Sequence, residues 1–339
     1  MKAAWRQLQP AVALVSASTA RRATALAVTA ALICLGCGGA APAPVVASGP
    51  WDNFRGDRSF GYLEQVCEIG PRISGTEGMR QQQELLQSHF EDLGAQVRYQ
   101  SFDVAHPETG MPVRLKNMIV TWHPQAEQRI LLCCHYDTRP WPDRELLPHN
   151  RRKPFIGAND GGSGVAVLME LGHHMASLKP RYGVDFVFFD AEELVYNSRR
   201  DKYFLGSEHF ARQYRDNPPG YRYEYGVLLD MVADRDFQVY YERNSLKYAR
   251  GVTLSVWAAA RGVGVREFIP RAKHEVLDDH IPLNQIARIP TTNVIDFDYP
   301  YWHKRNDLPA ACSPDTLEKV GRVMMYWLEN LPTAGPGVR

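Results

Sequence analysis

The chain has 339 residues, of which 23% are charged and 45% are hydrophobic, and its formal net charge is +1. The sequence contains no basic stripe, so a nucleic-acid partner is not expected. The length suits one large domain with a substantial core, and no internal linker is long enough to divide it. We therefore expect a single folded domain that works as a monomer.

Residues 1–37 have the pattern of an export signal. Arg21 and Arg22 precede an apolar run over 23–35, which is too short to span a bilayer as a stable helix. Leu35, Gly36 and Cys37 resemble the end of a bacterial lipobox, in which Cys37 would carry a lipid; plain secretion is the alternative. We expect an exported protein, either a cell-envelope lipoprotein attached to the membrane through this lipid or a periplasmic or secreted protein.

Residues 38–55 begin with a stretch rich in Ala and Pro, which predicts a flexible tether. The folded domain is then expected over 56–332. Export permits a disulfide, but the spacing of the four later cysteines assigns no pair and contains no Cys-x-x-Cys zinc pattern. These cysteines are Cys67, Cys133, Cys134 and Cys312.

Strand and helix patterns alternate along the domain. Helices are expected over 77–93, 164–175, 207–214, 246–260 and 314–331. Strands are expected over 118–122, 129–134, 184–189, 226–229, 237–241 and 292–295. This alternation predicts an α/β fold with a central, mixed but mostly parallel sheet and helices on both of its faces.

The stretch over 184–193 combines a strand with a group of acids. Its apolar run suits a strand that is buried on both faces, and Asp190, Glu192 and Glu193 follow directly. Ligands bind at the carboxyl ends of strands in open α/β sheets. Two adjacent glutamates allow a division of labour, in which one binds a metal ion and the other transfers a proton.

Other strands also end on possible ligands. Each of these residues has a simple structural explanation, such as a turn or a helix cap, but their recurrence at successive strand ends favours a shared site. Histidine nitrogens and carboxylate oxygens together suit Zn²⁺. The residues at these strand ends are His135, Asp137, Asp160, Asp230 and His303.

Several motifs carry a resemblance to the superfamily of zinc aminopeptidases and glutaminyl cyclases, which covers about residues 60–331. They are His135-Tyr136-Asp137, Gly157-Ala158-Asn159-Asp160, Phe188-Phe189-Asp190-Ala191-Glu192-Glu193, Leu228-Leu229-Asp230, Asp278-Asp279-His280-Ile281-Pro282 and Trp302-His303.

This resemblance implies a zinc-exopeptidase-like fold and a zinc-dependent catalytic domain over 56–332. It implies a zinc ion bound by Asp160, Glu193 and His303, with Glu192 as the proton-transfer residue. Asp137 would orient His135 from behind the metal site.

Two activities on the N-termini of peptides or proteins compete within the superfamily. In the aminopeptidases, His135 and Asp230 would bind a second zinc ion with Asp160 bridging, and activated water would hydrolyse the peptide bond. In the glutaminyl cyclases one zinc ion is used, and an N-terminal glutamine closes to pyroglutamate with release of ammonia. A non-catalytic surface lipoprotein that keeps the fold is a third, weaker alternative.

Three features resemble the cyclases more than the aminopeptidases. Asp278 matches an acid that pairs with the residue equivalent to Asp230 in cyclases, so both join Glu192 as catalytic candidates. Trp302 matches a wall of the cyclase pocket, and the segment over 194–205 matches in length. A pocket tryptophan of the family is replaced by Ser198, and we expect Phe297, Tyr299 and Tyr301 to supply the missing aromatic wall. The sequence therefore predicts a glutaminyl-peptide cyclotransferase, with zinc aminopeptidase as the alternative.

Overall fold

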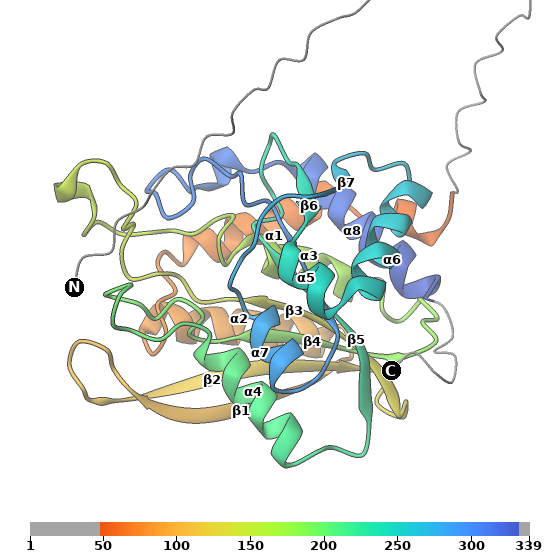
Figure 1. Cartoon of the computed structure of the whole chain (residues 1–339), viewed down its shortest axis with the longest axis horizontal. Helices are drawn as coiled ribbons and strands as arrows, with labels where there is room; N and C mark the ends of the chain where they lie inside the picture. The colour runs from red at the N-terminus through yellow and green to blue at the C-terminus, as the bar shows by residue number, and fades with distance from the viewer. Residues whose placement is uncertain (1–47, 332–339) are drawn as a thin grey trace, which may run out of the picture. The chain divides into compact units, whose positions relative to one another are not determined.

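The computed structural model describes residues 48–331, and a six-stranded sheet lies at the centre of this part of the chain (Figure 1). The strands nearest one edge, β1 and β2, are antiparallel to each other, and β2 is antiparallel to β4. The remaining four strands run parallel. The predicted mixed, mostly parallel sheet is confirmed. Its spatial order is β1 (Gln96–Ala105), β2 (Pro112–Trp122), β4 (Gly183–Phe189), β3 (Gln128–His135), β5 (Arg222–Asp230) and β8 (Thr291–Ile295).

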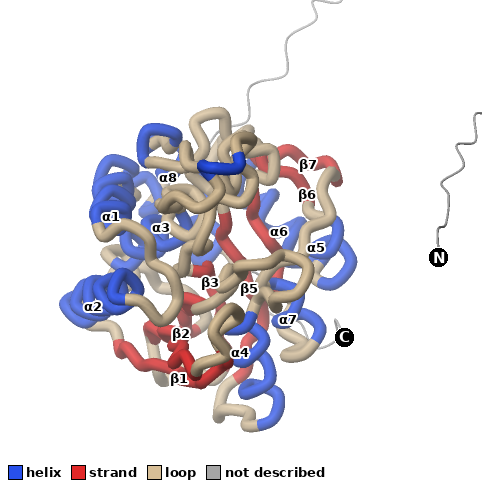
Figure 2. The backbone as a smooth tube through the Cα atoms, turned by 90° about the vertical axis from the view of Figure 1, so that its left-hand side faces the viewer, coloured by secondary structure: helices blue, strands red, loops and turns tan. Residues whose placement is uncertain are grey.

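Both faces of the sheet are buried, which explains the continuous apolar runs of its central strands. In β3, Ile130 and Leu132 belong to one hydrophobic core, whereas Leu131 and Cys133 belong to a second core. Helices on both sides cover these cores (Figure 2). The larger core is covered by α1 (Gly56–Glu68), α2 (Glu77–Asp92), α3 (Ser163–Gly172), α6 (Arg250–Gly262) and α8 (Pro314–Glu329), and the smaller by α4 (Leu205–Asp216) and α7 (His280–Gln285).

The helix expected over 246–260 is two helices in the structure. They are α5 (Arg243–Tyr248) and α6 (Arg250–Gly262), and the chain between them is non-helical at Ala249, with φ −137° and ψ 36°. Beside them lies a small parallel pair, β6 (Val239–Tyr241) and β7 (Phe268–Ala272).

The predicted tether extends too far along the chain. Residues Pro50–Asn53 form a short 3₁₀ helix, η1, that packs on α8. Trp51 is 8% exposed and Phe54 is 2% exposed, and the Trp51 ring lies 4.7 Å from that of Tyr326. Phe54 packs so closely on Gly321 that a Cβ there would come within 2.2 Å of its ring. Because these aromatic side chains are buried, the folded domain begins near residue 50 rather than 56.

The predicted signal over 1–37 and the first part of the predicted tether lie outside the described residues. Within residues 48–331, no helix is both long and apolar enough to cross a membrane. The thiols of Cys67, Cys133, Cys134 and Cys312 are free.

Candidate metal centre and active site

The carboxyl ends of the parallel strands bring most of the predicted site residues together. His135 and Asp230 are the last residues of β3 and β5, and the glutamate pair follows β4. Asp160 lies in the loop before α3, and His303 lies in the loop after β8. All of these side chains are buried. The sequence could therefore predict a site at this edge of the sheet, because the polar residues that follow parallel strands lie together at the carboxyl ends of those strands.

Asp160, Glu193 and His303 form a first set of possible metal ligands. One ligand atom from each lies within 4.8 Å of the others. Nε2 of His303 is 2.7 Å from Oε1 of Glu193 and 3.6 Å from Oδ2 of Asp160. Asp160 Oδ2 and Glu193 Oε2 are buried without a hydrogen-bond donor. Buried carboxylate oxygens need a partner, and a cation between these residues would provide one.

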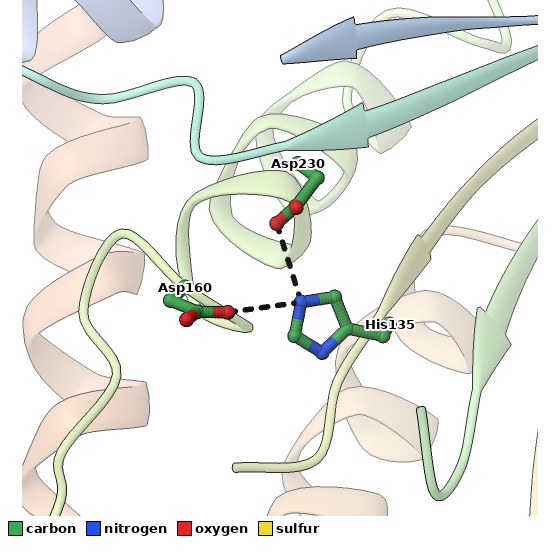
Figure 3. Close-up of side chains that lie close together, drawn as sticks. All are labelled: His135, Asp160 and Asp230. Atoms are coloured by element: carbon green, nitrogen blue, oxygen red, sulfur yellow. Dashed lines mark hydrogen bonds and ion pairs between the residues drawn. The ribbon is translucent and has the colours of Figure 1, made fainter. Parts of the chain in front are cut away.

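His135, Asp160 and Asp230 form a second set (Figure 3). The imidazole of His135 points between the two carboxylates, with Nε2 3.3 Å from Oδ1 of Asp160 and 3.2 Å from Oδ1 of Asp230. Asp160 belongs to both sets. The arrangement can therefore hold one ion, or two ions bridged by Asp160, and its nitrogen and oxygen donors fit Zn²⁺.

The site has more acidic than basic groups, and this excess of carboxylates raises the pKa values of several of its members. Burial and the charge of Glu193 raise the pKa of Asp160 to about 7. Burial lowers the pKa of His303, but the charge of Glu193 and the hydrogen bond to Asp143 outweigh it and raise that pKa to about 9. Crowded carboxylates of this kind disfavour their own ionisation. A divalent cation would relieve this repulsion.

Two residues behind the first ligand set were missed by sequence reasoning. Nδ1 of His303 donates to Oδ1 of Asp143 at 2.9 Å, which fixes the orientation of its imidazole. The buried guanidinium of Arg139 donates to Oε1 of Glu193 at 3.1 Å and to Oδ2 of Asp143 at 3.1 Å. Both residues lie in a polar loop, where no strand pattern indicates which side chains turn inward.

Asp137 has a different main role from the predicted one. Its two carboxylate oxygens accept the backbone N–H groups of Glu192 and Glu193, each at 3.0 Å. Its distance to Nδ1 of His135 is 3.7 Å, which is longer than a hydrogen bond. Asp137 therefore holds the turn that carries the glutamate pair, and its contact with His135 is secondary.

The backbone is strained at three points of the site. Ala191 has φ 56°, Met231 has φ 49° and His303 has φ 54°, so three non-glycine residues adopt the left-handed region beside or at predicted site residues. Such conformations persist where the surroundings enforce them, and they concentrate at functional sites. Asp190 supports the first of these turns, since its Oδ2 accepts the backbone N–H of Lys116 on β2 at 2.7 Å.

A cavity of about 380 Å³ opens over the first ligand set. Its walls include Glu192, Asp278, Phe297 and Trp302, and the rings of the last two lie 4.7 Å apart. Ser198 and Leu277 also line it. This volume is large enough for one amino-acid residue together with a short stretch of peptide.

Tyr299 does not belong with the pocket walls, although the sequence predicted it there. Its ring is buried in the core, and its hydroxyl donates to Oδ1 of Asp307 at 2.7 Å. Asp307 in turn accepts the backbone N–H groups of Asn159 and Asp160. Tyr299 therefore supports the metal-ligand loop from behind. The alternation of Phe297 and Tyr299 in sequence did not place both in the pocket because the chain turns between them.

Asp278 is held in a fixed position beside the cavity. Its Oδ2 accepts from Nδ2 of Asn293 at 2.7 Å, and its Oδ1 accepts the backbone N–H of Asp279 at 2.6 Å. Burial and the charge of Asp230 raise its pKa to about 6. Burial and the charge of Glu193 raise the pKa of Glu192 well above the usual value. A buried carboxylate with a raised pKa at a cavity wall is suited to proton transfer.

An α/β sheet whose strand ends present these histidines and carboxylates around a cavity defines a metal-dependent α/β enzyme. The chain belongs to peptidase family M28, whose family model matches residues 117–328. The predicted family and fold class are confirmed.

Individual relatives include both competing activities. The chain is 42% identical to a glutaminyl cyclase from Fimbriiglobus ruber, with a TM-score of 0.80 over 86% of this chain and 99% of that one. It is 31% identical to a leucine aminopeptidase precursor from Bacteroides thetaiotaomicron, with a TM-score of 0.77 over 82% of this chain and 97% of that one. The glutaminyl-peptide cyclotransferase of Drosophila melanogaster is 26% identical over 285 residues, which is 77% of each protein.

Proposed function

We propose that this protein is a zinc-dependent glutaminyl-peptide cyclotransferase, which converts the N-terminal glutamine of peptides and proteins to pyroglutamate. The observation that carries the proposal is the position of Asp278 and Trp302 in the walls of the same cavity as Glu192. At these two positions the sequence resembles the glutaminyl cyclases rather than the aminopeptidases. The 42% identity to a bacterial glutaminyl cyclase over nearly all of that chain supports the same conclusion.

The reaction is an intramolecular aminolysis. The α-amino nitrogen of the terminal glutamine forms a bond to the carbon of its own γ-carboxamide, and the bond from that carbon to the amide nitrogen breaks. Glu192 accepts a proton from the attacking amine and gives it to the departing nitrogen, which leaves as ammonia. A zinc ion held by Asp160, Glu193 and His303 would supply Lewis-acid polarisation of the γ-carbonyl oxygen.

The cavity walls position the substrate for this step. Trp302 and Phe297 form an apolar, aromatic side against which the methylenes of a glutamine side chain pack. Asp230 and Asp278 lie close enough that the charge of one raises the pKa of the other. Such a pair can share a proton and donate a hydrogen bond to the leaving nitrogen.

We further propose one zinc ion per chain, bound by Asp160, Glu193 and His303. Glu193 Oε2, which belongs only to this set, and Asp160 Oδ2, which both sets share, are buried without a hydrogen-bond donor. In the other set, Nε2 of His135 donates to Oδ1 of Asp230 at 3.2 Å, and neither carboxylate oxygen of Asp230 is buried without a donor. Zinc aminopeptidase remains the second candidate, because His135, Asp160 and Asp230 complete a second donor set and one similar structure is an aminopeptidase precursor.

The place of action is also proposed from the sequence. The pattern over 1–37 supports export, and Cys37 is the proposed lipid attachment site. Exported peptides or proteins with an N-terminal glutamine would then be the substrates of a monomeric enzyme.

One paired assay tests the proposal. The purified protein is incubated with a glutamine-terminated peptide, and the pyroglutamyl product, ammonia, free amino acids and bound zinc are measured together. We expect stoichiometric pyroglutamate and ammonia with one zinc ion per chain, and loss of activity after chelation. Glu192→Gln should remove activity and retain zinc, since Glu192 is not among the three proposed ligands. Release of free amino acids with two zinc ions per chain would establish the aminopeptidase instead.

A further inference from the structure

A basic and apolar loop projects beside the cavity, and apart from its first residue, which lines the cavity, it has no role in the proposed reaction. It comprises residues 144–153, which we name the basic loop, and it includes the short 3₁₀ helix η2 (Pro148–Asn150). In Figure 1 this yellow-green segment extends outward from the left of the domain. Its backbone begins next to the metal site, where the N–H of Arg144 donates to the carbonyl of His303 at 3.2 Å.

The tip of the basic loop exposes two adjacent leucines. Leu146 is 87% exposed and Leu147 is 55% exposed, and Leu146 is the most exposed large hydrophobic side chain among residues 48–331. Single exposed apolar side chains are common on proteins, but two neighbours at the end of a projecting loop form a small apolar wedge.

Cations surround this wedge. The ten residues of the basic loop contain four cations, Arg144, Arg151, Arg152 and Lys153, against one acid, Glu145. The side chains of the last three cations are exposed. No ion pair with another described residue involves the four cations. The guanidinium of Arg144 lies 3.8 Å from the centre of the Trp302 ring, whereas the charges of Arg151, Arg152 and Lys153 are available to an external partner.

The charge of the basic loop is opposite to that of the rest of the domain. Residues 1–47 and 332–339 contain five of the chain's 39 Lys and Arg residues and none of its 38 Asp and Glu residues. Residues 48–331 thus hold 34 cations against 38 acids, a net charge of −4, whereas the basic loop alone carries +3. A segment so different in sign from its surroundings directs the domain toward an anionic surface.

The basic loop is also held in shape. The guanidinium of Arg151 donates to the carbonyl of Glu145 at 2.7 Å, and Oε1 of Glu145 accepts the backbone N–H of Arg305 at 2.8 Å. The N–H of Asn150 donates to the carbonyl of Leu147 at 2.9 Å. These contacts hold the leucines in an outward position before any partner binds. The loss of conformational entropy on binding is therefore small.

We propose that the basic loop docks the domain on an anionic phospholipid bilayer. Leu146 and Leu147 insert at the boundary between headgroups and acyl chains, and the neighbouring cations contact the lipid phosphates. An acidic protein would satisfy the cations but would leave the two leucines exposed to water, so the combination favours a bilayer. This proposal goes beyond the enzymatic activity and does not depend on it or on a lipid at Cys37.

The test uses the chain from residue 45 onward, which forms a compact unit by itself and lacks the apolar segment of the N-terminus. Co-sedimentation is measured with vesicles of phosphatidylcholine alone and of phosphatidylcholine mixed with phosphatidylglycerol. We expect binding only to the phosphatidylglycerol vesicles. The double variants Leu146→Ser/Leu147→Ser and Arg152→Gln/Lys153→Gln should each reduce the partition coefficient about tenfold or more.

Matched controls remove similar groups from α6. Leu254→Ser and Arg250→Gln/Arg261→Gln change exposed residues of that helix and should bind as the parent chain does. In addition, Leu146→Trp should show a blue-shifted emission maximum when phosphatidylglycerol vesicles are added, as expected for insertion. The proposal is overturned by equal binding to both vesicle types, by unchanged binding of either basic-loop variant, or by equal losses in the α6 controls. It is also overturned if soluble polyglutamate binds as well as the vesicles, because charge alone would then explain the interaction.

Discussion

Oδ1 of Asp143 lies 2.9 Å from Nδ1 of His303, on the side of the imidazole opposite the other metal-ligand candidates. This contact keeps the proton on Nδ1, so that Nε2, which faces Glu193 and Asp160, would be the nitrogen that binds a metal ion. Arg139 joins the same arrangement, since it contacts both Asp143 and Glu193. Asp143, in the loop after β3, therefore fixes the orientation of a ligand candidate in the loop after β8.

Asp143→Asn should weaken zinc binding because the amide removes the negative charge that polarises His303. Loss of such a supporting carboxylate reduces metal affinity by about 10- to 100-fold. The measurement is a competition titration with a chromophoric chelator. Asp103→Asn, which alters an exposed acid paired with Arg114 on β1 and β2, should leave the zinc affinity unchanged. Equal affinity of Asp143→Asn and the parent chain would show that Asp143 does not support the ligand.

Asn293→Ala should reduce kcat about tenfold with little change in KM, because one oxygen of Asp278 would lose its only side-chain donor. Asp278 could then rotate away from the cavity while the substrate pocket stays intact. Steady-state kinetics with a glutamine-terminated peptide, together with the zinc content, provide the readout.

The control for Asn293 is a second buried asparagine. Asn284 hydrogen-bonds His280 and Thr291 and does not contact Asp278. Asn284→Ala should lower stability yet retain kcat in the folded fraction. If both alanine variants lose kcat equally, the effect of Asn293 is general loosening of this region rather than positioning of Asp278.

The strand-end residues could be predicted from sequence because they follow from two physical regularities. A strand buried on both faces must be apolar throughout, so a run such as 184–189 is visible, and the first polar residue beyond it marks the carboxyl edge of the sheet. His135 and Asp230 end their strands and the glutamate pair follows β4, as this reasoning predicted, whereas Asp160 reaches the same edge from the loop before α3. Their meeting in space then required only that the strands be parallel neighbours.

Other parts depend on tertiary contacts that no local pattern encodes. Arg139, Asp143 and Asn293 are polar residues whose importance comes from partners far along the chain. The edge strand β1 was missed because its residues alternate between exposed and half-buried and so lack an apolar run. The start of α5 at Arg243 depends on Glu242, whose carboxylate accepts the backbone N–H groups of Asn244 and Ser245.

Phe54→Ala should lower the free energy of unfolding by about 3–5 kcal/mol, the usual range for truncating a buried phenylalanine. The side chain is fully packed between α8 and the core, although the sequence assigned it to a tether. Urea unfolding followed by circular dichroism provides the value. Arg55→Ala changes the exposed neighbour and should alter stability by less than about 1 kcal/mol. A small effect of Phe54→Ala would restore the view that residues 48–55 are a tether.

Glu242→Gln should reduce the free energy of unfolding at neutral pH and should make that free energy depend less on pH in the acidic range. Glu242 is 1% exposed, and its carboxylate contacts His280 as well as the backbone of α5 and Val276. Burial raises its pKa, but the hydrogen bond and charge of His280 and the backbone donors outweigh burial and lower that pKa to about 2. The unfolded chain, with an ordinary glutamate, binds this proton more readily.

The sign of the pH dependence follows from that difference. A lowered folded-state pKa adds stability that is fully present above about pH 4.5 and is lost as the pH falls through about 2. At pH 7 the ionised carboxylate therefore contributes about 3 kcal/mol, an order-of-magnitude figure for a shift of this size. Urea midpoints of chelator-treated protein from pH 7 downward measure this without a contribution from zinc release. The stability difference between Glu242→Gln and the parent chain should become smaller as the pH falls. Glu84→Gln, an exposed change on α2, should have the stability of the parent chain at every pH. If the difference for Glu242→Gln stays constant with pH, packing rather than charge explains the loss of stability.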